Sequence, residues 1–220
     1  MDDFKMPDSI KKSAKTLPVI LMLDVSGSME GEPIHTLNES VKEMLEAFSK
    51  DESVIAEIKA AVVTFGGDAK MMYPLTNANE LKWTDMSACG GTPLGSAISI
   101  VEGLVEDKEK IPSNAYRPAV VLVSDGVPTD DWRSNFDSFL NAPRTSKCHR
   151  LALGVNMTEG DPAYRMLSEF VSKEEKVFLG DAKEIVKFFK YVTMSVGTRT
   201  KSVNPNIVPN ISGESDFDVC

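Results

Sequence analysis

The feature that most constrains the fold of this chain is an uninterrupted apolar run, residues 17–23, that stops at Asp24. A strand covered on both faces is apolar at every position, whereas a half-exposed strand alternates between apolar and polar residues. Similar short runs occur at 58–66, 119–123 and 149–155. These segments are predicted to be buried strands of a largely parallel sheet.

Segments with apolar residues at helical spacing separate the runs, which is typical of strand–helix alternation. The expected helices begin near Pro33, Pro93, Trp132, Pro162 and Asp181. A short run at 70–75 contains Pro74 and suits an edge strand, and 176–179 reads as a last short strand. We therefore expect an α/β, Rossmann-like, doubly wound domain with a mostly parallel six-stranded sheet and one antiparallel edge strand.

Two of these helices carry a predicted cap. Asp161 precedes Pro162 and is expected to cap the helix that follows. Asp181 and Glu184 have the spacing of a capping box, in which the two residues satisfy the first backbone N–H groups of a helix reciprocally.

The 220 residues suit one domain, and periodicity is lost at both ends. We expect an N-terminal extension at 1–16, a domain at 17–200 and a flexible C-terminal tail at 201–220, which is rich in Asn, Pro, Ser and acids.

The net charge of −9 argues against nucleic acid as a main partner, because phosphate neutralisation needs an excess of Lys and Arg. Three cysteines without CxxC spacing suggest a reducing compartment, and two histidines make a His-rich zinc site improbable. No apolar segment is long enough to cross a membrane or resembles a signal peptide. We expect a cytoplasmic protein with no membrane contact.

Chemically informative residues follow the expected strands at three places: 24–28 (Asp-Val-Ser-Gly-Ser), 90–95 (Gly-Gly-Thr-Pro-Leu-Gly) and 124–126 (Ser-Asp-Gly). Ligands of open α/β sheets bind at the carboxyl ends of strands, where strand order reverses. Carboxylate and hydroxyl oxygens suit Mg²⁺ or Mn²⁺ rather than softer metals. If 24–28 stays extended, its first, third and fifth side chains point one way, and Gly27 lets the backbone approach closely.

The charge of such a site suggests its use. Two carboxylates only balance a divalent cation, and hydroxyl ligands add no charge. A metal held this way has reason to recruit an anionic oxygen from outside, such as an Asp or Glu of a protein partner.

In this order, and after these strands, DVSGSM, GGTPLG and SDG resemble the metal-ion-dependent adhesion site (MIDAS) of the von Willebrand factor A family. The resemblance assigns the five metal-binding positions to Asp24, Ser26, Ser28, Thr92 and Asp125. It implies that the two serines coordinate directly, that Thr92 and Asp125 do so directly or through water, and that Asp24 acts through water. Mg²⁺ is the implied metal, with Mn²⁺ or Ca²⁺ as alternatives, and a partner's carboxylate completes the octahedron.

Longer stretches within 17–197, such as RPAVVLVSDGVPTDDW, resemble TerY-type proteins of bacterial tellurium-resistance and stress-response clusters. This resemblance implies a metal-binding scaffold or adaptor that works with a protein kinase and a phosphatase. It does not extend to the C-terminal tail.

Each motif also has a structural interpretation. Asp24 and the serines are common turn formers, and Thr92 before Pro93 is a plausible helix cap. Trp132 is either a binding anchor or a half-buried residue of a first helical turn. Cys89 is either redox-sensitive or simply a small packing residue, and His35 is expected on a helix surface.

Three functions compete. The leading one is a non-enzymatic interaction module. The second is a Mg²⁺-dependent phosphoryl-transfer enzyme with Asp24 as nucleophile, although no lysine adjoins the three loops and Ser26 stands where such a phosphatase would have a second Asp. The third is a domain whose metal only stabilises its own loops.

Overall fold

The computed structural model describes residues 14–51 and 56–208, so most of the N-terminal extension and the end of the tail, 209–220, lie outside the described residues. A six-stranded sheet has the order β3-β2-β1-β4-β5-β6. Its strands are β1 (Lys15–Asp24), β2 (Ala56–Gly66), β3 (Asp68–Asn77), β4 (Ala119–Ser124), β5 (His149–Val155) and β6 (Phe178–Gly180). All neighbours pair in parallel except β3, which is antiparallel to β2 at one edge.

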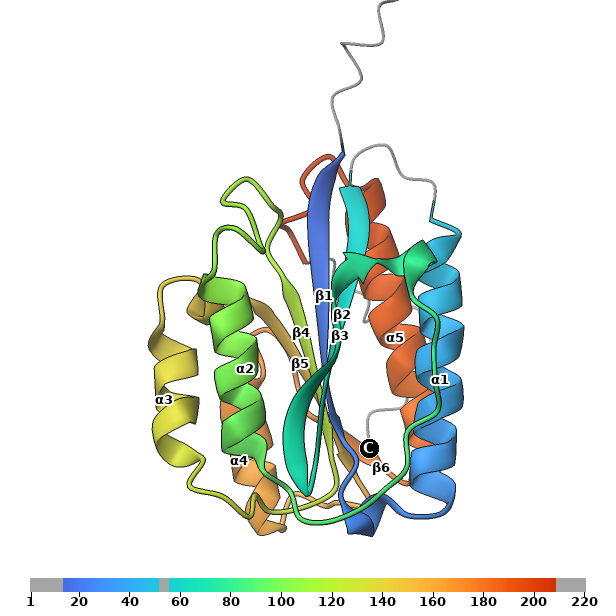
Figure 1. The fold of residues 1–220 in the computed structure, drawn as a ribbon, viewed down its shortest axis with the longest axis vertical. Helices are drawn as coiled ribbons and strands as arrows, with labels where there is room; N and C mark the ends of the chain where they lie inside the picture. The colour runs from blue at the N-terminus through green and yellow to red at the C-terminus, as the bar shows by residue number, and fades with distance from the viewer. Residues whose placement is uncertain (1–13, 52–55, 209–220) are drawn as a thin grey trace, which may run out of the picture.

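Helices cover both faces of the sheet (Figure 1). On one face lie α1 (Glu32–Ser49) and α5 (Ala182–Lys201). On the other lie α2 (Leu94–Glu106), α3 (Arg133–Asn141) and α4 (Pro162–Phe170). The predicted fold class, a doubly wound sheet with one antiparallel edge strand, is confirmed.

The apolar run at 17–23 is buried for the expected reason. Val19, Leu21 and Leu23 pack toward α1 and α5, whereas Ile20 and Met22 pack toward the opposite helices. All five are fully buried. A central strand between two helical layers has no solvent side, so each position gains from being apolar.

Of the two predicted helix caps, the one at α5 forms in part and the side-chain cap at α4 does not form. Asp181 caps α5 by accepting the Lys183 N–H at 2.8 Å, but Glu184 pairs with Lys187 rather than completing a capping box. Asp161 makes no side-chain cap for α4, because its carboxylate accepts the N–H and hydroxyl of Thr158. A side chain that hydrogen-bonds to a nearby loop cannot at the same time cap a helix, and the Asp161 carboxylate bonds to Thr158 instead.

The chain after α5 turns back onto the domain. Arg199 Nε donates to the carbonyl of buried Pro205 at 2.8 Å, and Asn206 Oδ1 accepts the Arg117 N–H at 2.7 Å. Residues 202–208 are thus tied to the start of β4. No helix among the described residues is long and apolar enough to span a membrane.

Candidate metal centre

The site predicted from the sequence lies where the order of strands reverses. β1 and β4 are neighbours at the centre of the sheet, and the chain leaves them toward opposite edges. Asp24 is the last residue of β1, and Ser124 is the last residue of β4. Ser124 Oγ donates to Asp24 Oδ2 at 2.7 Å, so the two strand ends are joined by a side-chain hydrogen bond. This is the crevice in which open α/β sheets bind ligands.

Four of the five predicted ligands form one hydrogen-bonded cluster. The Ser26 N–H donates to Asp24 Oδ1 at 2.9 Å, and the Ser26 and Ser28 hydroxyl oxygens lie 3.0 Å apart. Ser28 Oγ then donates to Asp125 Oδ1 at 2.8 Å. The structure therefore brings the oxygens of Asp24, Ser26, Ser28 and Asp125 together, while their role as metal ligands stays a prediction.

The first loop reaches this geometry by a route that the sequence argument did not predict. Residues 24–28 do not stay extended, because Gly27–Met29 form a 3₁₀ turn in which the Met29 N–H donates to Ser26 O at 3.0 Å. The extended conformation on which the sequence argument made the convergence of these side chains conditional is therefore not adopted. Met29 is fully buried, and its burial favours the turn that brings Ser28 back toward Ser26 and Asp125.

Thr92 lies in a loop that is tied to both of the others. The Gly27 N–H donates to Gly90 O at 2.9 Å, which joins the first loop to the second. Thr92 and Thr129 exchange two bonds of 2.9 Å, Thr92 N–H to Thr129 Oγ1 and Thr129 N–H to Thr92 O, which join the second loop to the third. The three predicted loops are thus linked pairwise.

Gly90, rather than Gly27, is the glycine that this packing requires. Its φ is +70°, and a Cβ there would lie 2.4 Å from the Gly67 Cα. A Cβ on Gly27 would meet Gly90 O at an ordinary 3.5 Å. The close approach attributed to Gly27 therefore occurs at Gly90, where the backbones of two loops touch.

Asp130 is a supporting residue that sequence reasoning missed. Its carboxylate accepts the N–H groups of Gly95 at 3.0 Å and Ser96 at 2.9 Å, so it caps α2 from a different loop. The Thr92 side chain, a candidate cap, makes no cap bond to α2. Sequence rules for helix capping consider only the residues next to the helix. The sole sequence signal for this cap is the pair of acids, Asp130 and Asp131, and nothing in the pattern links them to α2.

Burial raises the pKa of both carboxyls of the cluster. The pKa of the fully buried Asp24 is raised to about 6, although bonds from Ser26 and Ser124 lower it. The pKa of Asp125 is raised for the same reason, against the Ser28 hydrogen bond. Burial disfavours the ionised form of a carboxyl group, and a nearby cation favours it.

The donor set fits a hard divalent cation. Among the described residues no group of three or more His, Cys, Asp or Glu could hold a metal ion. The cluster itself offers two carboxylates and two serine hydroxyls. These are oxygen donors of the kind that Mg²⁺ and Mn²⁺ accept.

The secondary candidates lie near this edge without joining the cluster. Trp132 is half-buried and packs edge-on against Phe136, with ring centroids 5.2 Å apart. Cys89 is exposed, and its N–H donates to Val25 O at 2.8 Å. His35 is exposed on α1. The structure supports the packing interpretation of Trp132.

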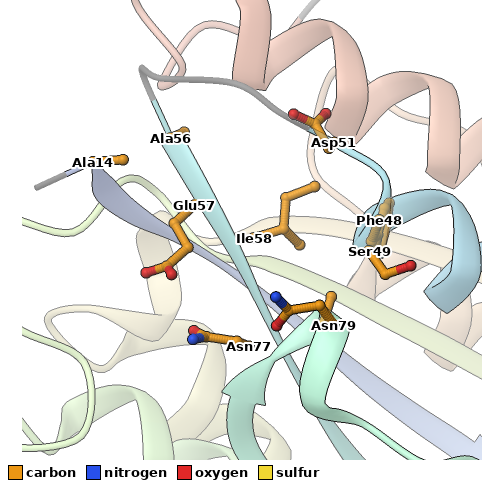
Figure 2. Close-up of a pocket in the computed structure, with 10 residues that line it drawn as sticks. Ala14, Phe48, Ser49, Asp51, Ala56, Glu57, Ile58, Asn77 and Asn79 are labelled. Carbon is orange, nitrogen blue, oxygen red and sulfur yellow. The ribbon is translucent and has the colours of Figure 1, made fainter.

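A hollow of about 340 Å³ lies at the other end of the sheet (Figure 2). Phe48, Asp51, Glu57 and Asn77 are among the residues that line it. It shares no residue with the predicted site and lies beside 52–55, which are outside the described residues.

The comparisons with known proteins agree with this architecture. Residues 19–127 match the family model of the von Willebrand factor type A domain. No significant match was found among curated proteins.

Three of the similar solved structures come from diverse sources. The pilus adhesin SpaC from Lactobacillus rhamnosus GG has a TM-score of 0.69 at 13% identity, covering 86% of this chain and 31% of SpaC. The mussel byssus protein PTMP1, with a zinc-occupied MIDAS motif, has a TM-score of 0.62 at 19% identity, covering 84% and 46% of the two chains. The ArnB paralog VWA2 from Sulfolobus acidocaldarius has a TM-score of 0.58 at 18% identity, covering 81% and 45%.

Fold and site together define an α/β domain with an oxygen-rich crevice at its strand switch point. Over residues 19–127 the chain is similar to the von Willebrand factor type A domain. It spans less than half of each of these three solved chains, and its likeness to them is one of fold.

Proposed function

We propose that this chain is a non-enzymatic protein-interaction module that uses a MIDAS to bind a carboxylate of a protein partner. The observation that carries the proposal is the hydrogen-bonded cluster of Asp24, Ser26, Ser28 and Asp125 at the strand switch point, with Thr92 in the adjoining loop. Mg²⁺ is the proposed metal, with Mn²⁺ or Ca²⁺ as alternatives.

The proposed site has residues that bind the cation, a residue that positions them, and an open coordination position. In the proposed site the hydroxyls of Ser26 and Ser28 and the oxygens of Thr92 and Asp125 face the cation, while Asp24 stands behind them, held by Ser26 and Ser124. Because two carboxylates only neutralise a divalent cation, the protein leaves it able to attract a further anionic ligand. A bound cation would supply an open coordination position for the partner's Asp or Glu.

We further propose that the module acts as a cytoplasmic scaffold or adaptor in a bacterial tellurium-resistance or stress-response system. Support comes only from the resemblance of the sequence to TerY-type proteins. A protein kinase and a phosphatase of such a system are the proposed partners.

A pull-down from an extract of the source cells tests the proposal. The bait is wild type in Mg²⁺, wild type in EDTA, and Asp125→Ala in Mg²⁺. Glu109→Ala is the matched control, because Glu109 is an exposed acid in a loop at the opposite edge of the sheet. A partner retained by wild type and Glu109→Ala in Mg²⁺, and lost in the other two samples, is the expected result.

Equal retention in all samples would contradict the proposal. A rise in the melting temperature with Mg²⁺, without any metal-dependent partner, would favour the structural-metal alternative. Hydrolysis of phosphate esters that Asp24→Ala abolishes would favour the phosphoryl-transfer alternative.

A further inference from the structure

The loops that follow the parallel strands carry charge of one sign only. These loops are residues 25–31, 67, 125–132, 156–161 and 181, and they contain no Lys or Arg. Their acidic residues, which we call the acidic rim, are Glu30, Asp125, Asp130, Asp131, Glu159, Asp161 and Asp181. The carboxyl ends of parallel strands meet at one edge of the sheet, so the rim lies at the same edge as the candidate metal centre.

Part of the rim is available to a partner. Asp130, Asp161 and Asp181 accept backbone N–H groups, and Asp125 belongs to the cluster itself. In the described part of the chain, the exposed side chains of three rim residues make neither a hydrogen bond nor an ion pair. These three are Glu30, Asp131 and Glu159.

Three loops at the opposite edge of the sheet have the reverse balance. The loops 107–118, 142–148 and 171–177 hold Lys108, Lys110, Arg117, Arg144, Lys147, Lys173 and Lys176 against Asp107, Glu109, Glu174 and Glu175. The acidic rim is therefore a property of the site edge and does not merely reflect the net charge of −9.

An apolar side chain stands beside the centre on the same edge. Val127, two residues after Asp125, is 54% exposed. The other large apolar residues that are exposed in the described chain, Val203 and Ile207, lie in the segment after α5. Val127 therefore gives a binding partner an apolar surface to contact among the charged residues of this edge.

We propose that the partner's carboxylate is set among lysines or arginines, next to an apolar residue that contacts Val127. This inference rests on the proposed function, because it describes the surroundings of the carboxylate that the metal would bind. A partner rich in acids would place like charges against Glu30, Asp131 and Glu159, which disfavours binding. Lysines or arginines next to the partner's carboxylate would pair with the acidic rim and would also increase the association rate of the two proteins.

Selection from a phage-displayed peptide library tests the inference. Each peptide has one fixed Glu between randomised residues, the immobilised bait is the full chain in Mg²⁺, and EDTA elutes only metal-dependent binders. We expect Lys and Arg to outnumber Asp and Glu at the flanking positions by about five-fold or more. Raising the salt concentration should weaken this preference, since exposed charges are screened.

Two charge-reversal variants of equal net charge serve as a matched pair. Glu30→Lys/Asp131→Lys/Glu159→Lys reverses the charge of the three exposed rim acids and should abolish the preference for Lys and Arg beside the fixed Glu of the peptides. Glu46→Lys/Glu57→Lys/Glu109→Lys alters exposed acids outside the site-edge loops and should retain it. Equal melting temperatures would establish that both variants are folded.

The outcomes distinguish failure of this inference from failure of the proposed metal-dependent binding. EDTA-eluted peptides with neutral or acidic flanks, or a basic preference unchanged in the rim variant, would overturn the inference and leave the proposed function standing. Absence of any EDTA-eluted peptide, or equal elution from Asp125→Ala, would overturn both.

Discussion

The carboxyl group of Asp24 is held in place by both burial and hydrogen bonds. It is fully buried at the end of a central strand, where ionisation is costly, and it is held by the Ser26 N–H and the Ser124 hydroxyl. These bonds offset part of the cost of burial, but the pKa still lies at about 6. The residue is pre-oriented toward the crevice and gains further stabilisation from a nearby cation.

Ser124→Ala should weaken metal binding without changing the five proposed ligands. The substitution removes a 2.7 Å bond to Asp24 Oδ2 and leaves that buried oxygen unpaired, which should cost about 2 kcal/mol of stability. The Mg²⁺-induced rise in melting temperature should shrink. Ser168→Ala, at an exposed serine bonded only within α4, is the control. Identical Mg²⁺ titrations for Ser124→Ala and wild type would contradict the supporting role of Ser124.

The two described cysteines should differ sharply in reactivity. Burial raises the pKa of the Cys148 thiol to about 12, whereas Cys89 is exposed. The thiolate is the reactive form, so N-ethylmaleimide at pH 8 should label Cys89 and spare Cys148, as peptide mass spectrometry would show. Comparable labelling rates at both sites would disagree with the packing described here.

The same thiol makes stability depend on alkaline pH. The folded state holds the Cys148 proton more tightly than the unfolded chain, so the contribution is full below the ordinary pKa of 9.0. It declines as the pH rises toward about 12. The unfolding free energy of Cys148→Ala should change less over this range than that of wild type.

At the scale of elements, the segment between the short helix η3 (Ala78–Glu80) and α2 depends on side chains for its position. It runs beside α1 toward the candidate centre (Figure 1). Asn38 of α1 pairs with the Met86 backbone through two bonds, Nδ2 to Met86 O at 2.9 Å and Met86 N–H to Oδ1 at 2.8 Å. Tyr73 accepts the Thr84 N–H at 2.9 Å. The loop that bears Thr92 is thereby held against the domain.

Asn38→Ala should destabilise the protein by about 2–4 kcal/mol, because it leaves a buried backbone donor and acceptor of Met86 unpaired. Urea unfolding measures the loss. Asn38→Asp keeps only the acceptor and should lie between Ala and wild type. Asn141→Ala, at an exposed residue of α3, is the control. A change below about 0.5 kcal/mol at Asn38 would show that other contacts hold the segment.

At the scale of the whole molecule, the segment after α5 is fastened by a buried arginine. Arg199 is fully buried and donates to the carbonyls of Pro205 and Arg117. Its burial lowers the pKa of the guanidinium to about 10. One side chain thus connects the end of α5, the returning segment and Arg117, two residues before β4.

Arg199→Ala should release residues 202–208 and lower the unfolding free energy by about 2–4 kcal/mol, since hydrogen bonds from a buried charged group are lost. Limited proteolysis should then cleave after α5 sooner than in wild type, and urea unfolding should shift to lower concentration. Lys201→Ala, two residues on and exposed, should behave as wild type. Unchanged cleavage rates would mean that Arg199 does not fasten the segment.

The amino-acid sequence by itself was sufficient to predict the layers of the fold and the positions of its strands. Patterns such as the run at 17–23 report burial on two faces, a property that each residue carries in its own polarity. The grouping of Asp24, Ser26, Ser28 and Asp125 was predictable for a related reason, because parallel strands end at one edge.

Only the tertiary structure decided how these parts are held. The 3₁₀ turn at Gly27–Met29, the capping of α2 by Asp130, the hydrogen bond from Ser124 to Asp24 and the fastening by Arg199 all depend on which distant segments meet. Hydrophobic pattern is encoded locally, whereas hydrogen-bond partners are selected by packing among segments far apart in the chain. Composition along the chain likewise does not reveal that the acids of separate loops lie at one edge of the sheet.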